Sequence, residues 1–258
     1  MFKIGYMEYA NVYPIFYYLL KNKNLSFFKS YPAELNKAMR EGRIDLSPSS
    51  SIEYAKNSSL YKVISGISVS SVGAVKSVNV FSDIPLEKMG GKKIYFTKES
   101  NTSTVLTRII FEEFYKIPVE YTNSLEEAHA ELLIGDKALY SYYNTDYKYI
   151  FDLGQEWYKF TGLPFVFALW IVGKNAWQKD EFRLLADELR HYASISCKNY
   201  SHLTENYIEL GYTAEQMSDY WNTIDYNLTD KHIEGLKLFY DYAHRLGEAP
   251  FVSEIGFC

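Results

Sequence analysis

Apolar and polar residues follow two different periods along residues 1–172, and the alternation between these periods predicts an α/β fold. Short apolar runs rich in β-branched and aromatic residues indicate strands, whereas apolar residues three or four positions apart indicate helices. The expected strands are 2–6, 26–30, 44–47, 61–71, 75–81, 93–96, 119–122, 132–134, 148–151 and 165–172. The expected helices between them are 11–20, 32–40, 102–115 and 124–130. Strands and helices in alternation indicate layered α/β units.

The stretch 132–172 is the most informative part of this pattern. Its first apolar run stops at residues 135–136, as a buried strand stops at a loop. A short amphipathic helix then begins near Glu156 and ends at Gly162, and Pro164 cannot continue it. The almost wholly apolar run 165–172 predicts a buried strand along which the chain leaves one lobe for another.

After residue 170 only helical patterns are expected. One helix has its apolar face at 182–193, a second covers 201–210, and a last long helix covers 229–246. Thr213 and Gln216 have the spacing of a capping box.

These elements predict a two-lobed, type II periplasmic-binding-protein-like fold with a helical C-terminal segment. Lobe 1 is expected to hold residues 1–80 and 173–258, and lobe 2 residues 81–172, with crossing strands near 75–81 and 165–172. Ligands of such folds lie in the cleft between the lobes, near strand ends and helix N-termini.

Composition narrows the possible partners. The formal charge of −5 gives no general attraction for nucleic acid or an anionic membrane, so an anionic ligand needs a local site. Two cysteines far apart do not indicate a disulfide framework or a metal cage. No signal-peptide pattern, membrane-length apolar run or phosphate-binding glycine motif occurs, and nothing in the pattern requires a metal or an organic cofactor. We expect a cytoplasmic protein whose partner is a small molecule.

Four loops that follow expected strands are rich in hydroxyl and amide groups. They lie at 6–11, 48–51, 70–77 and 97–104. Backbone N–H groups at helix starts, together with Ser and Thr hydroxyls, bind carboxylates without many cations. Taken singly, a Ser or Thr before a helix is more often a cap than a ligand, and residues 49–51 have the pattern of a hydroxyl-capped helix start.

Several segments of residues 2–172 together resemble the chorismate dehydratases of the futalosine route to menaquinone. The segments are YANV at 9–12, SSIEYA at 50–55, VKSV at 75–78, KESNTS at 98–103, LLIGDKAL at 132–139 and TGLPFVFA at 161–168. Ala74, Lys98 and Glu8 depart from the usual family residues. The helical tail after residue 175 carries little of this resemblance.

The resemblance implies dehydration of chorismate to 3-[(1-carboxyvinyl)oxy]benzoate, with Asn11 and Ser77 as catalytic residues. From the residues alone, Asn11 is equally well a helix N-cap, and Ser77 a strand residue that faces a neighbour. The residues expected to bind substrate are Ser49, Ser50, Ser71, Lys76, Thr102, Ser103, Thr104, Gly135 and Asp136.

A general base is harder to find in the sequence. All five histidines lie outside the motif loops and are expected to be ordinary exposed residues. Asp136 and Glu53 are expected to accept backbone N–H bonds at helix starts, and Arg40 to be solvated. For Lys76, ligand contact and a structural ion pair are equally plausible. Phe165, Phe167 and Trp170 either wall the ligand or fill the core. We therefore hypothesise that the enolpyruvyl carboxylate of the substrate itself takes the proton.

Two other functions fit the same fold. One is a non-catalytic solute-binding protein, for which an export signal is expected. The other is the related 1,4-dihydroxy-6-naphthoate synthase, which resembles this chain in fold and relies on a histidine in the second lobe. His129 is the only histidine in the expected second lobe, and it lies outside the motif loops.

Overall fold

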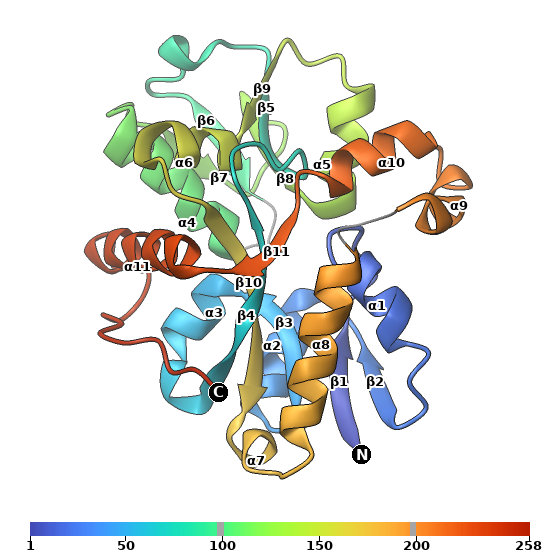
Figure 1. The fold of residues 1–258 in the computed structure, drawn as a ribbon. Helices are drawn as coiled ribbons and strands as arrows, with labels where there is room; N and C mark the ends of the chain where they lie inside the picture. The colour runs from blue at the N-terminus through green and yellow to red at the C-terminus, as the bar shows by residue number, and fades with distance from the viewer. Residues whose placement is uncertain (97–100, 197–199) are drawn as a thin grey trace.

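Two β-sheets, one above the other in Figure 1, organise the chain. The computed structural model describes residues 1–96, 101–196 and 200–258. Sheet 1 has the order β11-β4-β10-β3-β1-β2, and sheet 2 the order β7-β6-β8-β5-β9. The strands of sheet 1 are β1 (Phe2–Tyr6), β2 (Leu25–Lys29), β3 (Leu46–Ser50), β4 (Tyr61–Ser71), β10 (Phe165–Gly173) and β11 (Asp225–Leu228). The strands of sheet 2 are β5 (Val78–Ser82), β6 (Lys93–Phe96), β7 (Glu120–Thr122), β8 (Ala130–Ile134) and β9 (Tyr149–Asp152).

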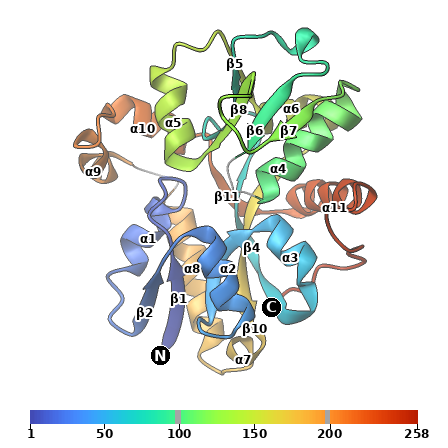
Figure 2. The same cartoon turned by 180° about the vertical axis from the view of Figure 1, so that it is seen from behind.

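Helices accompany both sheets. Around sheet 1 lie α1 (Tyr13–Leu19), α2 (Pro32–Arg40), α3 (Ser51–Lys56), α7 (Lys174–Trp177) and α8 (Phe182–Ser196). Around sheet 2 lie α4 (Asn101–Arg108), its π-helical continuation Ile109–Phe114, α5 (Gly135–Asn144) and α6 (Leu153–Thr161). The tail adds α9 (Glu205–Ile208), α10 (Ala214–Trp221) and α11 (Asp230–Arg245). Short 3₁₀ turns cover Ser58–Leu60, Leu86–Lys88 and Ser201–Leu203. Figures 1 and 2 both place α11 at the level where the two sheets meet.

The directions of the strands place several strand ends in the region where the two sheets meet, which we call the join. β1 runs parallel to β2 and to β3, and β6 runs parallel to β7 and β8. β10 is antiparallel to both β3 and β4. The chain passes from sheet 1 to sheet 2 at residues 72–77, and it reaches β10 again through residues 162–164. The division into lobes by residue number stays a prediction.

The core of sheet 1 is centred on β10, and most of its side chains are buried. Trp170 packs against Phe16 of α1, with ring centroids 5.7 Å apart. Phe165 contacts Trp157 of α6 at 5.2 Å and Phe239 of α11 at 5.1 Å. Each such side chain contributes about 1.5–3 kcal/mol on full burial. The long apolar run of the sequence therefore joins helices from three distant parts of the chain.

Some predicted elements are wrong, each for a local reason. Residues 124–129 form turns and bends instead of a helix, because β8 already begins at Ala130 and so short a helix is marginal without packing. The third strand was expected to end before Pro48, but β3 continues to residue 50. Proline has no N–H to donate, and it is tolerated here because β3 pairs with β1 only as far as Leu46. The loop expected after β8 is helix α5, and the tail expected to be helical contains the strand β11.

No helix among residues 1–96, 101–196 and 200–258 is long and apolar enough to cross a membrane.

Gly235 shows how closely α11 packs on the join. A Cβ at this position would lie inside van der Waals distance of the Pro164 carbonyl oxygen. Gly235→Ala is expected to destabilise the protein by about 1–3 kcal/mol in denaturant unfolding, although alanine favours helix. Gly90→Ala, at a site with no atom within 4 Å of the new Cβ, is the control and should leave stability unchanged. Equal stability of both variants would contradict the close packing.

Candidate functional site

A cavity of about 110 Å³ lies where the two sheets meet, and both sheets contribute to its wall. From the sheet 1 side come the loop after β1, the start of α2, the end of β3, and β10. From the sheet 2 side come the 75–78 segment and the first residues of α4 and α5. The polar side chains of the lining are Tyr9, Asn11, Asn36, Ser50, Ser77, Asn101, Thr102 and Ser103. The apolar part includes Met7, Val12, Val69, Val75, Val78, Ile134 and Phe167.

Asn11 lies in the loop between β1 and α1. Its side-chain oxygen Oδ1 is buried and has no hydrogen-bond partner in the described part of the chain. The N-cap of α1 is Val12, so the interpretation of Asn11 as a helix cap is wrong. Its backbone is held by Tyr226, whose hydroxyl donates to the Asn11 carbonyl at 2.8 Å. The amide of Asn11 is therefore available to a molecule in the cavity.

Ser77 lies just before β5 and is 2% exposed. Tyr220 Oη donates to Ser77 Oγ at 3.0 Å. The Ser77 carbonyl accepts from the Gly135 N–H at 2.8 Å, which ties the loop to the start of α5. The structure thus brings Asn11 and Ser77 to one cavity from opposite sides of the join.

The expected hydroxyl cap of α3 is wrong. Ser50 is the N-cap of this helix, but its side chain makes no capping bond, and it lines the cavity instead. The neighbouring hydroxyls of Ser49 and Ser51 are buried with no partner among the described residues. The first turn of α3 is capped from the other side of the join, because Ile52 N–H donates to Thr102 Oγ1 at 3.2 Å. This bond links α3 directly to α4.

Gly135 begins α5 with a φ of +60°. A Cβ there would be strained in this backbone region and would lie 3.5 Å from the ring of Tyr9. The positive φ is therefore what favours glycine here, since a Cβ would make only an ordinary contact with Tyr9.

Five residues predicted to bind substrate do not line the cavity: Ser49, Ser71, Lys76, Thr104 and Asp136. Ser71 Oγ donates to the Gly73 carbonyl at 2.8 Å. Lys76, at a φ of +62°, makes an ion pair with Asp219 of α10. Thr104 is on α4, one residue beyond the part of the helix that lines the cavity. These residues lie behind the wall, and a role in binding stays a prediction for each.

The carboxylates of Asp136 and Asp152 bind the backbone of the two loops that contain Asn11 and Ser77. Asp136 was expected to accept N–H groups at a helix start, but its Oδ1 accepts the N–H of Ala10, in the loop before α1, at 3.0 Å. Burial raises the pKa of Asp136, and the Ala10 N–H partly opposes this shift. Asp152 accepts the N–H groups of Val75 and Lys76 at 2.9 and 2.6 Å. Burial raises its pKa as well, against these backbone bonds.

None of the described residues that line the cavity is charged. Glu8 is exposed and pairs with Lys29 at 2.6 Å, and Lys98 and Glu99 lie outside the described residues. Helices α2, α4 and α5 all begin at the lining, so their N-termini place partial positive charge there. The cavity can therefore stabilise an anion through N–H dipoles, hydroxyls and amides.

Three other expectations about charged residues have clear outcomes. Arg40 is not simply solvated, because it donates to both oxygens of the buried Glu53 at 2.8 and 2.7 Å. Glu53 accepts these side-chain bonds, and one from Tyr61 Oη, in place of the expected backbone N–H groups. His232 is buried and pairs with Asp225 at 3.2 Å; the other four histidines are exposed, as expected.

Several residues of the site were missed from the sequence. Asn36 is a polar residue between the buried Leu35 and Ala38 of α2. A polar residue that interrupts an apolar helix face could have indicated a site residue from the sequence. Asn101 lies inside a segment that carries the family resemblance. Tyr220 and Tyr226 had no signal, because the resemblance ended before the tail. Of the three aromatic residues of β10, Phe167 lines the cavity, and the other two belong to the core.

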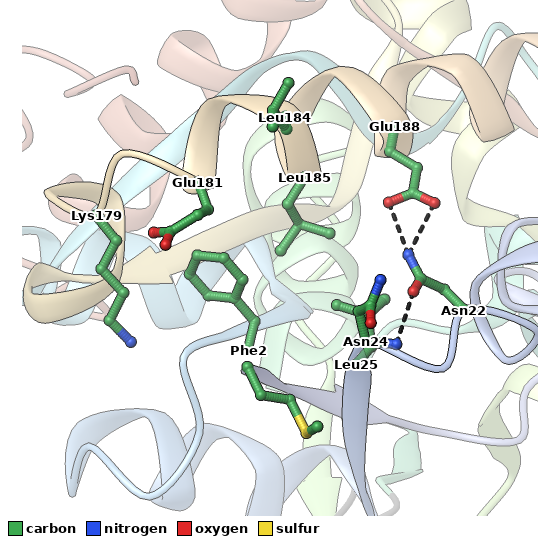
Figure 3. A pocket seen from close by; sticks show the side chains of 10 residues that line it. Phe2, Asn22, Asn24, Leu25, Lys179, Glu181, Leu184, Leu185 and Glu188 are labelled. Carbon is green, nitrogen blue, oxygen red and sulfur yellow. Dashed lines mark hydrogen bonds between the residues drawn. The ribbon is translucent and has the colours of Figure 1, made fainter.

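A second, open hollow of about 530 Å³ lies near the amino ends of β1 and β2, beside α8 (Figure 3). Asn22 donates to both carboxylate oxygens of Glu188 there, at 2.9 and 3.0 Å. None of the predicted site residues lines this hollow. The smaller cavity between the sheets is therefore the candidate site.

Asp136 gives the fold a pH dependence. A folded-state pKa above the unfolded value means that protonation favours the native state, and this contribution is lost as the pH rises through the raised pKa. Asp136→Asn should therefore gain stability relative to the wild type as the pH rises from 4 to 7, by about 1.4 kcal/mol for each unit of pKa shift. Thermal melts across this range test the trend. Asp146→Asn, a change at an exposed carboxylate, corrects for the loss of one charge. A difference that shrinks with pH would contradict the raised pKa.

Known proteins resemble this chain at two levels. A sequence model described as menaquinone biosynthesis matches residues 2–245. Chorismate dehydratase from Thermus thermophilus is 30% identical over 187 residues, which is 65% of this chain and 68% of that protein. Chorismate dehydratase from Campylobacter jejuni is 30% identical over 171 residues, which is 64% of each chain.

Solved structures are similar in fold at lower identity. A protein from Archaeoglobus fulgidus has a TM-score of 0.76 at 18% identity and covers 95% of this chain and 97% of its own. The alkanesulfonate-binding protein of Xanthomonas axonopodis pv. citri, bound to MOPS, has a TM-score of 0.69 at 14% identity, over 96% and 94%. The periplasmic aliphatic sulphonate binding protein of Escherichia coli has a TM-score of 0.69 at 13% identity, over 96% and 93%. These likenesses confirm the predicted periplasmic-binding-protein-like fold.

The family match spans nearly the whole chain and agrees with the predicted resemblance. The chain therefore belongs to the menaquinone biosynthesis family.

Proposed function

We propose that this chain is a chorismate dehydratase, a lyase that removes water from chorismate to give 3-[(1-carboxyvinyl)oxy]benzoate. The observation that carries the proposal is that Asn11 and Ser77, distant in sequence, line one cavity between the sheets in a member of this family. The two relatives named as chorismate dehydratases support the choice of substrate.

The cavity suits the two carboxylates of this substrate without a cation. The N–H dipoles at the starts of α2, α4 and α5 face this cavity and favour an anion there. The hydroxyls of Ser50 and Thr102 and the amides of Asn36 and Asn101 add neutral donors from both sides. Neutral donors leave the charge on the substrate available for chemistry.

The reaction needs positioning more than a strong catalyst. The ring C–H bond at the carbon that bears the enolpyruvyl ether breaks, its electron pair forms the new ring double bond, and the neighbouring C–O bond breaks. The proton removed from the ring and the leaving hydroxyl together make up the one water that is released, and the gain of aromaticity drives the step. Asn11 and Ser77 hold the leaving hydroxyl or a carboxylate by hydrogen bonds that strengthen as charge develops.

The proton acceptor in this proposal is the enolpyruvyl carboxylate of the substrate. Because none of the described lining residues is charged, none of them offers an Asp, Glu or His as a base. The substrate carboxylate is joined to the reacting carbon through the enol carbon and the ether oxygen. Such an intramolecular group has a high effective concentration.

We infer that the cavity widens to admit the substrate. A volume of about 110 Å³ is well below the roughly 300 Å³ at which ligand pockets usually begin. The bond from Ile52 to Thr102 lies across the join and is one that separation of the sheets would break. The structure thus supports a cycle in which the cavity opens to admit chorismate and closes before water leaves.

The purified protein should convert chorismate to a species lighter by one water, without added metal or cofactor. Asn11→Ala and Ser77→Ala should each lower kcat about 100-fold or more, since both remove hydrogen bonds to developing charge. Chromatography with mass detection measures the product. Ser51→Ala, at a buried hydroxyl that does not line the cavity, is the control and should keep wild-type turnover. Stable and unbound chorismate would contradict the proposal, whereas binding without turnover would indicate a solute-binding protein.

Glu8→Gln should keep kcat within about twofold of the wild type, because Glu8 is exposed and paired with Lys29 outside the cavity. Steady-state kinetics, with substrate binding measured by calorimetry, test this expectation. Glu99→Gln is expected to behave in the same way if the substrate is its own base. Loss of turnover with intact binding in either variant would show that a protein carboxylate takes the proton.

A further inference from the structure

The tail from residue 200 onward holds both loops that carry the candidate catalytic residues. Trp221 Nε1 donates to the Ala10 carbonyl, and Tyr226 Oη to the Asn11 carbonyl, each at 2.8 Å. These two bonds fix backbone. Tyr220 is different, because its hydroxyl contacts the side-chain oxygen of Ser77 at 3.0 Å. A tail residue therefore acts directly on a side chain that lines the cavity.

Tyr220 keeps its proton in this position. Its side chain is 1% exposed, and burial raises the pKa of its phenol far above the usual value of 10. The hydrogen bond to Ser77 partly opposes this rise in pKa, and Asp136, Tyr212 and Tyr143 nearby add to it. The buried phenol therefore keeps its proton, and its hydroxyl donates to Ser77 Oγ.

The geometry sets the direction of the Ser77 hydroxyl. A serine hydroxyl has one hydrogen and two lone pairs, and a phenol is a stronger acid than an aliphatic alcohol. Tyr220 therefore donates, and Ser77 Oγ accepts. The Ser77 hydrogen is then free to point elsewhere, and Ser77 lines the cavity. Without Tyr220, the hydroxyl could rotate and accept from the ligand as readily as donate to it.

We propose that Tyr220 is a positioning residue that fixes the Ser77 hydroxyl as a hydrogen-bond donor toward the substrate. The inference rests on the proposed dehydratase function and deepens it, since it assigns Ser77 to the leaving hydroxyl or a carboxylate oxygen, both of which accept. A donor that is already oriented loses no free energy to reorganisation when charge develops on the leaving oxygen.

Tyr220→Phe tests this role, because it removes only the donor and keeps the ring. The expected result is a kcat lowered about tenfold, the factor that corresponds to one ordinary hydrogen bond, with KM within about twofold of the wild type. Tyr54→Phe is the matched control: Tyr54 is also 1% exposed, and its hydroxyl binds the Gly256 N–H at 2.8 Å, away from the cavity lining. It should lower the melting temperature similarly and leave kcat unchanged.

The double variant Tyr220→Phe/Ser77→Ala separates positioning from mere structural support. If Tyr220 acts through Ser77, the double variant is no slower than Ser77→Ala alone in single-turnover experiments, because the loss has already occurred. Losses that multiply would overturn the inference, and so would a Tyr220→Phe enzyme as fast as the wild type. In both of these cases the wild type still dehydrates chorismate. An inactive wild type would instead overturn the proposed function and this inference with it.

Discussion

Buried loops need partners for their backbone N–H and C=O groups, and the site of this protein is built from the side chains that supply them. The loop with Asn11 and the loop with Ser77 both lie where the two sheets meet, and several of their backbone groups bond to side chains there. Asp136 and Asp152 accept from N–H groups of these loops, and Tyr226 donates to a carbonyl. These bonds come from segments far apart in the chain, so the loops have one arrangement only when the whole fold has formed.

This arrangement explains how acidic groups can stand near a site for an anion. The carboxylates of Asp136 and Asp152 accept backbone N–H groups and do not line the cavity. Lys76 is likewise occupied by Asp219. The described lining is left neutral, and helix N-termini supply its electrostatic potential. Fixed dipoles of this kind need no counterion and do not change protonation with pH, which suits a reaction in which the substrate supplies its own base.

Where the sequence predicted well, the signal was local. The strand at 61–71, the helix at 32–40 and the capping box at Thr213 all depend on residues close in the chain, and all are confirmed. Prediction failed where a distant partner decides. Strand β11 is too short to be recognised without β4 beside it, and Gly135 ends a strand yet begins a helix because its positive φ fits the turn.

Residue types and their spacing were enough to identify the α/β class, the family, and the motif loops that contain Asn11, Ser77 and Thr102. Which of the predicted residues meet depends on how the folded elements pack. This packing placed Lys76 in an ion pair behind the wall and brought Tyr220 of the tail to Ser77. The physical reason is that hydrogen bonds and burial between distant segments form only on folding, and no local pattern records them.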